Sequence, residues 1–288
     1  MKHLRSYLSA LVILLCLPGI HAQDDLSLPI SLDKITDNLY QLMGGRGSNG
    51  GVIIGDNAVL VIDAKMNEAS VNQTLDAIKK LTDKPVKYLV NTHSDGDHIQ
   101  GNRYFPATVT FIAHENCRED FFKVNFGRAS DWDDPRYFPF VPSITFTDQL
   151  DIWLGKSKVE LHYFGVGHTT GDAIVYCPSS KTAFVADLYF EGRPQLIHSM
   201  KGGNSFDYVK SMKLMLEKLY AETFLSGHSD PVGRAEIKKH IQEMEGRQEE
   251  VKVLVKDGKT QEEVLAKFTE NEKRLVTSIY QELSATSE

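Results

Sequence analysis

The segment 91–98, which reads NTHSDGDH, constrains this chain more than any other part of the sequence. Two imidazoles and two carboxylates lie within six residues, directly after the strand-like run Val86–Val90. Side chains at strand ends collect into sites in sheets that helices cover, and imidazole together with carboxylate suits zinc, iron or manganese. Taken alone, the segment could also be a solvated acidic turn.

Three further segments place a metal-competent side chain just after an apolar strand run. The first run leads into segment 165–172, which reads GVGHTTGD and contains His168; the second leads into Asp187, and the third into His228. Four such coincidences are not expected by chance. We therefore expect the four strand ends to meet at one edge of a sheet, which weakens the interpretation of segment 91–98 as a surface turn.

Strand-like and helical patterns mix along the chain, which predicts a mixed α/β fold with sheets covered by helices. The expected strands are 39–43, 51–54, 58–62, 86–92, 108–113, 159–164, 172–177, 182–186 and 222–226. The expected helices are 67–82, 98–104, 115–122 and 205–220. Residues 23–37 are expected to be loosely held, the glycine-rich stretch 44–50 to be a flexible loop, and 125–142 to be a long surface loop.

The first 22 residues are expected to be a cleaved secretory signal. Lys2 and Arg5 precede the apolar run Leu8–Leu17, and the small residue Ala22 ends the segment. The run is too short for a membrane anchor, which needs about 20 apolar residues. This pattern places the mature protein in the periplasm or outside the cell.

The mature chain, residues 23–288, is expected to form a single domain, with amphipathic helices packed on it from about residue 235. The net charge of −7 argues against a nucleic-acid partner or an anionic membrane surface, so the expected partner is a small-molecule substrate. Cys117 and Cys177 lack metal-binding spacing and are expected to be free thiols. His114 is expected to cap a helix or to support a metal ligand rather than to bind metal itself. His162 and His240 are expected to be structural, the latter on a surface helix.

The order of these motifs, HxDxDH, then GxGHTxGD, AD and GH, resembles the metallo-β-lactamase superfamily over nearly the whole mature chain. The closest likeness is to its cyclase or metallo-hydrolase branch. The resemblance implies an αββα sandwich with metals at one sheet edge. It implies a first metal on His93, Asp95 and His168, a second on Asp97, His98 and His228, and Asp187 bridging the two. Asp63 matches an acid that supports the metal loop in this family.

Asp95 departs from the family pattern, which has a histidine at this position. It is expected to bind the first metal directly; the alternatives are that it binds through water, or that it does not bind and leaves one firmly held metal. A carboxylate at this position also resembles the di-iron flavodiiron branch. Two divalent ions are therefore expected, with zinc first and iron or manganese as alternatives.

Together with the expected signal segment, the resemblance implies an exported hydrolase that cleaves an ester, thioester, lactone or amide by attack of a metal-bound hydroxide. Coordination lowers the pKa of water from about 15.7 to about 7, and Asp97 is the expected catalytic residue that orients the nucleophile and passes on its proton. A β-lactamase proper is the alternative, although Asp187 stands where the clinically noted β-lactamases carry cysteine or serine. A di-iron oxidoreductase is the alternative of another class, but the chain has no nucleotide fingerprint or flavodoxin-like extension.

Overall fold

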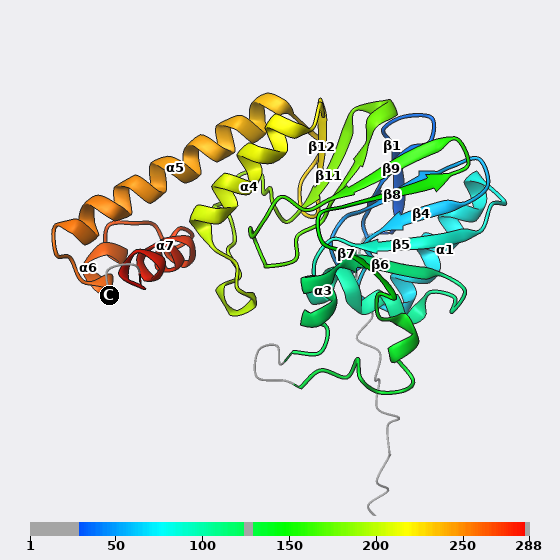
Figure 1. Cartoon of the computed structure of the whole chain (residues 1–288), viewed down its shortest axis with the longest axis horizontal. Coiled ribbons are helices and arrows are strands. Elements are labelled where there is room, and N and C mark those ends of the chain that lie inside the picture. Colours follow the sequence, from blue (N-terminus) through cyan, green and yellow to red (C-terminus); the bar gives the residue numbers. More distant parts are fainter. Residues whose placement is uncertain (1–28, 124–128, 286–288) are drawn as a thin grey trace, which may run out of the picture.

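The computed structural model describes residues 29–123 and 129–285 (Figure 1), so the expected signal segment 1–22 lies outside the described residues. A seven-stranded sheet forms the first half in simple sequence order. Its first four strands pair antiparallel and the last four pair parallel. The strands are β1 (Ser31–Lys34), β2 (Leu39–Met43), β3 (Gly50–Ile54), β4 (Val59–Ile62), β5 (Val86–Asn91), β6 (Thr110–His114) and β7 (Ile144–Phe146).

The second sheet has six strands in the order β13-β12-β11-β10-β9-β8. All its neighbours pair antiparallel except β11 and β12, which run parallel. The strands are β8 (Gln149–Leu154), β9 (Ser157–His162), β10 (Ile174–Cys177), β11 (Thr182–Ala186), β12 (Thr223–Ser226) and β13 (Val232–Gly233). The strands of each sheet thus follow one another in chain order. Stacking of the two sheets then places the ends of β5, β11 and β12 near one another.

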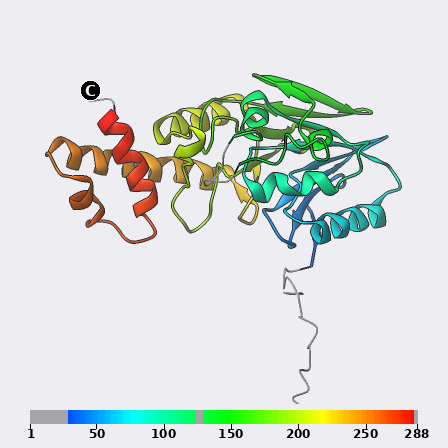
Figure 2. The same ribbon diagram turned by 90° about the horizontal axis from the view of Figure 1, so that it is seen from below.

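Helices cover the outer face of each sheet. They are α1 (Glu68–Leu81), α2 (Gly96–Ile99), α3 (Glu115–Asp120), α4 (Ser205–Lys218), α5 (Arg234–Lys256), α6 (Gln261–Leu265) and α7 (Lys273–Ala285). Side-chain caps fix where the two 14-residue helices begin: Asn67 accepts from the backbone of Ser70 before α1, and Asn204 accepts from Phe206 and Asp207 before α4. Figures 1 and 2 show α5–α7 extending away from the sheets.

Alternation along the central strands sends neighbouring side chains into different layers. In β4, Leu60 and Ile62 point into the core between the two sheets, whereas Val59 and Val61 join the layer under α1. On the second sheet, Phe184 of β11 faces the same central core. Two sheets that share one apolar interior, each with helices outside, confirm the expected αββα sandwich.

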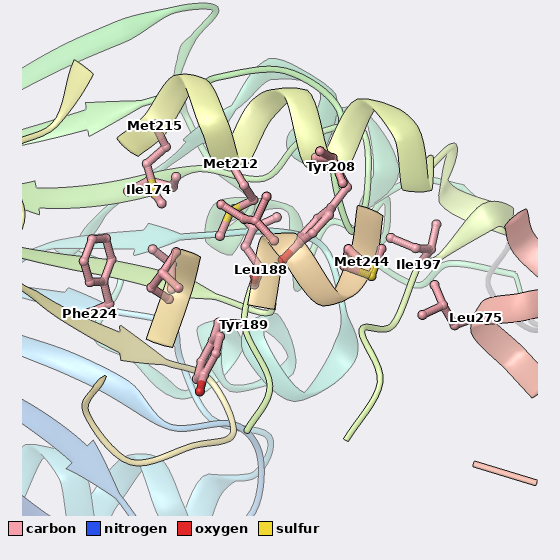
Figure 3. Close-up of a cluster of buried hydrophobic side chains, with 14 of the residues drawn as sticks. Ile174, Leu188, Tyr189, Ile197, Tyr208, Met212, Met215, Phe224, Met244 and Leu275 are labelled. Carbon is pink, nitrogen blue, oxygen red and sulfur yellow. Dashed lines mark hydrogen bonds between the residues drawn. The ribbon is translucent and has the colours of Figure 1, made fainter. Parts of the chain in front are cut away.

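The outer face of the second sheet carries a separate apolar layer (Figure 3). Phe224 of β12 and Ile174 of β10 pack there against Met212 and Met215 of α4. Met244 of α5 belongs to the same layer, as do buried side chains of α6 and α7. The C-terminal helices therefore continue the core over the sheet, as the amphipathic pattern after residue 235 predicts.

Several local expectations were wrong. The loosely held start contains β1, which pairs with β2 from Ser31↔Met43 to Lys34↔Tyr40. β7, β8 and β13 were not expected either. The stretch 44–50 is tied to the site rather than flexible, because the backbone N–H of Ser48 donates to Asp97 (3.2 Å) and that of Asn49 donates to Gly227 (2.6 Å).

The segment 125–142 is also more closely packed than a surface loop. Residues 124–128 lie outside the description, but Trp132 and Val141 are buried in one cluster with Phe121. A ring of Trp132 lies 5.0 Å from that of Phe121. Across residues 29–123 and 129–285, no helix is both long and apolar enough to span a membrane.

Candidate metal centre

The four strand ends that carry the motifs do meet at one edge of the sandwich. His93, Asp95, Asp97 and His98 lie on the segment between β5 and the end of α2, and His168 lies in the turn between β9 and β10. Asp187 follows β11 directly and His228 follows β12. In the described part of the chain these side chains form two groups whose ligand atoms lie within 4.8 Å of one another; they are His93, Asp95, His168 and Asp187, and Asp97, His98 and His228.

The first group converges on the carboxylates of Asp95 and Asp187. Asp95 Oδ2 lies 3.1 Å from His168 Nε2 and 3.7 Å from His93 Nε2. Asp187 Oδ2 lies 3.9 Å from each of these two nitrogens. The side chain of Asp95 is only 15% exposed and points into the group, which is the placement that direct ligation requires and not that of a surface residue.

The second group uses the other oxygen of the same aspartate. Asp187 Oδ1 lies 3.2 Å from His98 Nε2 and 3.4 Å from His228 Nε2. Asp97 Oδ2 is 3.7 Å from His98 Nε2 and 3.3 Å from His228 Nε2. Asp187 therefore presents one oxygen to each group, which is the arrangement that a bridging ligand needs.

Buried polar atoms in the centre make no hydrogen bond. Within the described residues, these atoms include His93 Nε2, His98 Nε2 and Asp187 Oδ1. A buried polar atom without a partner costs about 1–3 kcal/mol, so native structures seldom retain several of them together. Divalent ions would satisfy all three at once, and imidazole with carboxylate is a donor set that zinc, iron and manganese accept. The residues present thus fit a metal centre.

Hydrogen-bond partners at the Nδ1 atoms turn the Nε2 atoms of three histidines toward the centre. His98 Nδ1 lies 2.7 Å from Asp63 Oδ2, and His168 Nδ1 lies 2.9 Å from the carbonyl of Leu196. Thr92 Oγ1 lies 3.1 Å from His93 Nδ1 and itself donates to Asp63. Such partners fix both the tautomer and the ring orientation of a ligating histidine. The supporting position expected for Asp63 is what the structure has.

The charges of the centre shift the pKa of His168, His228 and Asp187 toward the charged form. Burial alone would lower the pKa of His168, but the hydrogen bond and charge of Asp95 outweigh it and raise the value to about 9. Burial would also lower the pKa of His228, but the nearby carboxylates of Asp187 and Asp97 outweigh it and raise the value to about 9. Burial would raise the pKa of Asp187, yet the charges of the histidines hold it well below its usual range. Metal ions bind the neutral form of imidazole, so they would compete with protons at these rings.

Two lysines at the centre were not foreseen. Lys201 Nζ lies 2.7 Å from Asp95 Oδ1. Lys65 is buried and donates to the carbonyl of Ser48 in the stretch beside Asp97, and burial lowers its pKa to about 8 against the charges of Asp97 and Asp63. Neither lysine stands in a motif. No local signal in the sequence distinguishes them from surface lysines.

The remaining histidines and cysteines lie outside the centre. His114 caps α3 by accepting from the backbone N–H of Asn116, as expected, and His162 contacts Glu160 on β9. His240 does lie on a helix, but the expected surface position was wrong, because the side chain is buried against Gln195. Cys117 and Cys177 are both free and buried.

Three hollows lie in the part of the molecule around the motif segments. One, of about 440 Å³, is lined by His228, Asn49 and Glu191, and another, of about 620 Å³, is lined by Ser94 and Trp132 among others. A third hollow of about 560 Å³ lies between segment 189–195 and α5, and none of the seven clustered side chains lines it. Of the three, only the hollow of about 440 Å³ is lined by a clustered residue, His228, so it opens directly onto the centre.

Residues 43–228 match the family model of the metallo-beta-lactamase superfamily. The chain belongs to this superfamily. The matched range contains all seven clustered residues, and membership makes the chain a metal-dependent hydrolase with a candidate metal site. The helices α5–α7 lie beyond the matched range.

The chain matches known relatives over most of their length. The chain is 24% identical over 230 residues to a metallo-beta-lactamase type 2 of Elizabethkingia meningoseptica, covering 77% of this chain and 87% of the relative. It is 20% identical over 224 residues to the type 2 enzyme of Bacteroides fragilis, covering 75% and 85%. The structure of a metallo-beta-lactamase from Pontibacter korlensis superposes with a TM-score of 0.61 at 16% identity, covering 74% of this chain and 99% of that one.

Proposed function

We propose that the seven clustered residues hold two divalent metal ions and that the protein hydrolyses an ester, thioester, lactone or amide bond in a small molecule. The observation that supports this most is the placement of Asp187, whose two oxygens face the two groups of donors. Two ions held by these residues would lower the pKa of a water molecule and polarise the carbonyl under attack.

The exposure of the clustered residues distinguishes those that would hold the metal ions from those that would face the substrate. His93, His98 and His168 are at most 1% exposed and would hold the ions away from solvent. Asp97 and His228 are 31% and 30% exposed, so they face the substrate side.

Asp97 is the proposed catalytic residue. Burial would raise its pKa, but the hydrogen bond to His228 and the charge of His98 lower it, so the carboxylate is ionised at neutral pH. An ionised carboxylate can accept the proton of the nucleophile and return it to the leaving group. His228, which contacts Asp97 at 3.3 Å, holds that carboxylate in place.

Zinc is the first proposed metal, because four histidines contribute to the centre. Asp95 adds a carboxylate, and harder ions such as manganese or iron(II) accept carboxylates readily. We further propose that the signal-like start directs the protein out of the cytoplasm, where it would meet extracellular substrates.

A β-lactam, which is a cyclic amide, is the second candidate substrate. The names of the Elizabethkingia and Bacteroides relatives favour it. Asp187 disfavours a β-lactam substrate, because the clinically noted β-lactamases carry cysteine or serine at the matching position. We therefore rank hydrolysis of another ester, thioester, lactone or amide first.

The test is elemental analysis of protein purified without added metal, paired with hydrolysis of a p-nitrophenyl ester, a thioester, an acyl lactone and a chromogenic cephalosporin. We expect close to two metal ions per chain, loss of hydrolysis on chelation and recovery on adding zinc. Asp187→Asn should lose both ions, whereas Asp207→Asn on the exposed start of α4 should lose none. At most one ion after reconstitution, or hydrolysis that chelation leaves intact, would contradict the proposal.

A further inference from the structure

The ammonium group of Lys201 donates all its hydrogen bonds to groups inside the protein. It ends the 3-10 helix Ser199–Lys201, and its side chain is 9% exposed. Nζ lies 2.7 Å from Asp95 Oδ1, 2.8 Å from the carbonyl of Ser94 and 3.1 Å from Ser94 Oγ. A lysine ammonium has three N–H donors, so these three acceptors use all of them. Lys201 is therefore not placed to anchor an anionic substrate.

The backbone that carries Lys201 is fastened to the turn that carries His168. The N–H of Thr170 donates to the carbonyl of Lys201 (3.2 Å), and the N–H of His198 donates to that of His168 (2.8 Å). A Cβ on Gly203 would lie 2.1 Å from the carbonyl oxygen of His168, so the two segments approach as closely as glycine permits. The ammonium is consequently fixed relative to the first group of donors.

The two oxygens of Asp95 face different partners. Oδ1 faces Lys201, and Oδ2 faces His168 and His93. Only Oδ2 is thus directed at the first metal position. The aspartate also brings one negative charge to a position where the family pattern has a neutral imidazole, and Lys201 brings one positive charge to the same carboxylate.

We propose that Lys201 is a positioning residue for the first metal site, which restricts Asp95 to one ligating oxygen and offsets the charge that the aspartate adds. This inference rests on the proposed two-metal function. It implies that Asp95 and Lys201 are energetically coupled, so that replacing one changes the effect of replacing the other. Asp95→His alone would leave a buried ammonium beside a neutral ring and two metal ions, whereas Asp95→His with Lys201→Leu would remove both members of the pair and approach the family's histidine pattern.

The experiment is a double-mutant cycle on the full chain, comparing wild type, Asp95→His, Lys201→Leu and the double variant. Zinc affinity is measured by competition with a chromophoric chelator, and urea unfolding is measured on protein stripped of metal. Asp95→His should lower the zinc affinity of the first site by about 10- to 100-fold, as changes around metal ligands do, while the second site keeps its affinity. Adding Lys201→Leu should recover most of that loss and should also raise the urea midpoint of the stripped protein.

A matched control replaces an exposed lysine. Lys213 pairs with Glu245 on the surface, so Lys213→Leu in the Asp95→His background should rescue neither readout. Additive effects of Asp95→His and Lys201→Leu in both readouts, or an Asp95→His variant that binds both ions as tightly as wild type, would overturn the inference. Wild type that binds neither zinc, manganese nor iron(II) would instead refute the proposed function, so the two failures are distinguishable.

Discussion

Asp63 illustrates how a residue outside the ligand set controls the centre. Its Oδ1 accepts from the backbone N–H of Thr92 at 2.8 Å, and its Oδ2 lies 2.8 Å from Thr92 Oγ1 and 2.7 Å from His98 Nδ1. The residue adopts a positive φ of 58°, a left-handed conformation that aspartate and asparagine tolerate better than most side chains. One carboxylate thereby aligns His98 and the start of the metal-binding segment.

Asp63→Asn keeps the shape of the side chain and a residue that suits the backbone, but it removes the charge that supports His98. We expect affinity for the more weakly held ion to fall about 10- to 100-fold, because outer partners of metal-bound histidines contribute that much. Chelator competition measures the change. Asp33→Asn on the exposed strand β1 is the control and should change nothing. Wild-type affinity in Asp63→Asn would remove this role from Asp63.

At the scale of the elements, α5 reaches the centre through a relay of side chains. His240 Nε2 lies 3.1 Å from Gln195 Oε1, and Gln195 Nε2 donates to the carbonyl of Asp187 at 2.7 Å and to that of Leu196 at 3.1 Å. Leu196 in turn accepts from His168. A helix beyond the matched family range thus supports the segment that carries the bridging aspartate.

Burial of His240 lowers its pKa to about 4. The group is depressed relative to about 6.5 in the unfolded chain, so the unfolded state takes up the proton first. Its contribution to stability is present above about pH 6.5 and is lost as the pH falls toward 4. We expect His240→Gln, which cannot titrate, to flatten the loss of stability across this window in urea titrations at several pH values. An unchanged slope would show that His240 does not take up this proton on unfolding.

Which elements could be predicted depended on whether their own residues carry a signal. β4, β5 and β11 are apolar runs with marked ends, and Asp63, the segment that begins at Thr92, and Asp187 follow these ends. β1 is polar and exposed at a sheet edge, so its order comes from pairing with β2 and leaves no pattern of its own. Lys201 and Asp95 are 106 residues apart, and only the folded chain shows that they pair.

At the scale of the whole molecule, the C-terminal helices share a core with the second sheet. Phe224 of β12, Met212 of α4, Ile241 of α5 and Val276 of α7 belong to one buried cluster. The views show these helices reaching well beyond the sheets, yet their apolar faces are continuous with the layer in Figure 3. The helices and the sandwich are therefore expected to unfold together.

Ile279→Ala tests that expectation. Ile279 lies on α7 and is fully buried, and truncating a buried isoleucine costs about 2–5 kcal/mol. We expect one cooperative transition when fluorescence and circular dichroism are followed together. Its midpoint should move to lower urea, and the free energy of unfolding should fall by about 2–5 kcal/mol. Val253→Ala on α5 is the control, since Val253 is 48% exposed and such changes stay within about 0.5 kcal/mol. Two separate transitions, with the main one unmoved, would show that α7 folds independently of the sandwich.

The central claim is that this centre holds two metal ions on either side of Asp187. Anomalous diffraction from crystals of the zinc-loaded protein, recorded above and below the zinc absorption edge, tests it most directly. We predict two peaks about 3.5–4 Å apart, one within bonding distance of His93, Asp95 and His168 and the other of Asp97, His98 and His228. A single peak, or none at this edge of the sandwich, would contradict the account.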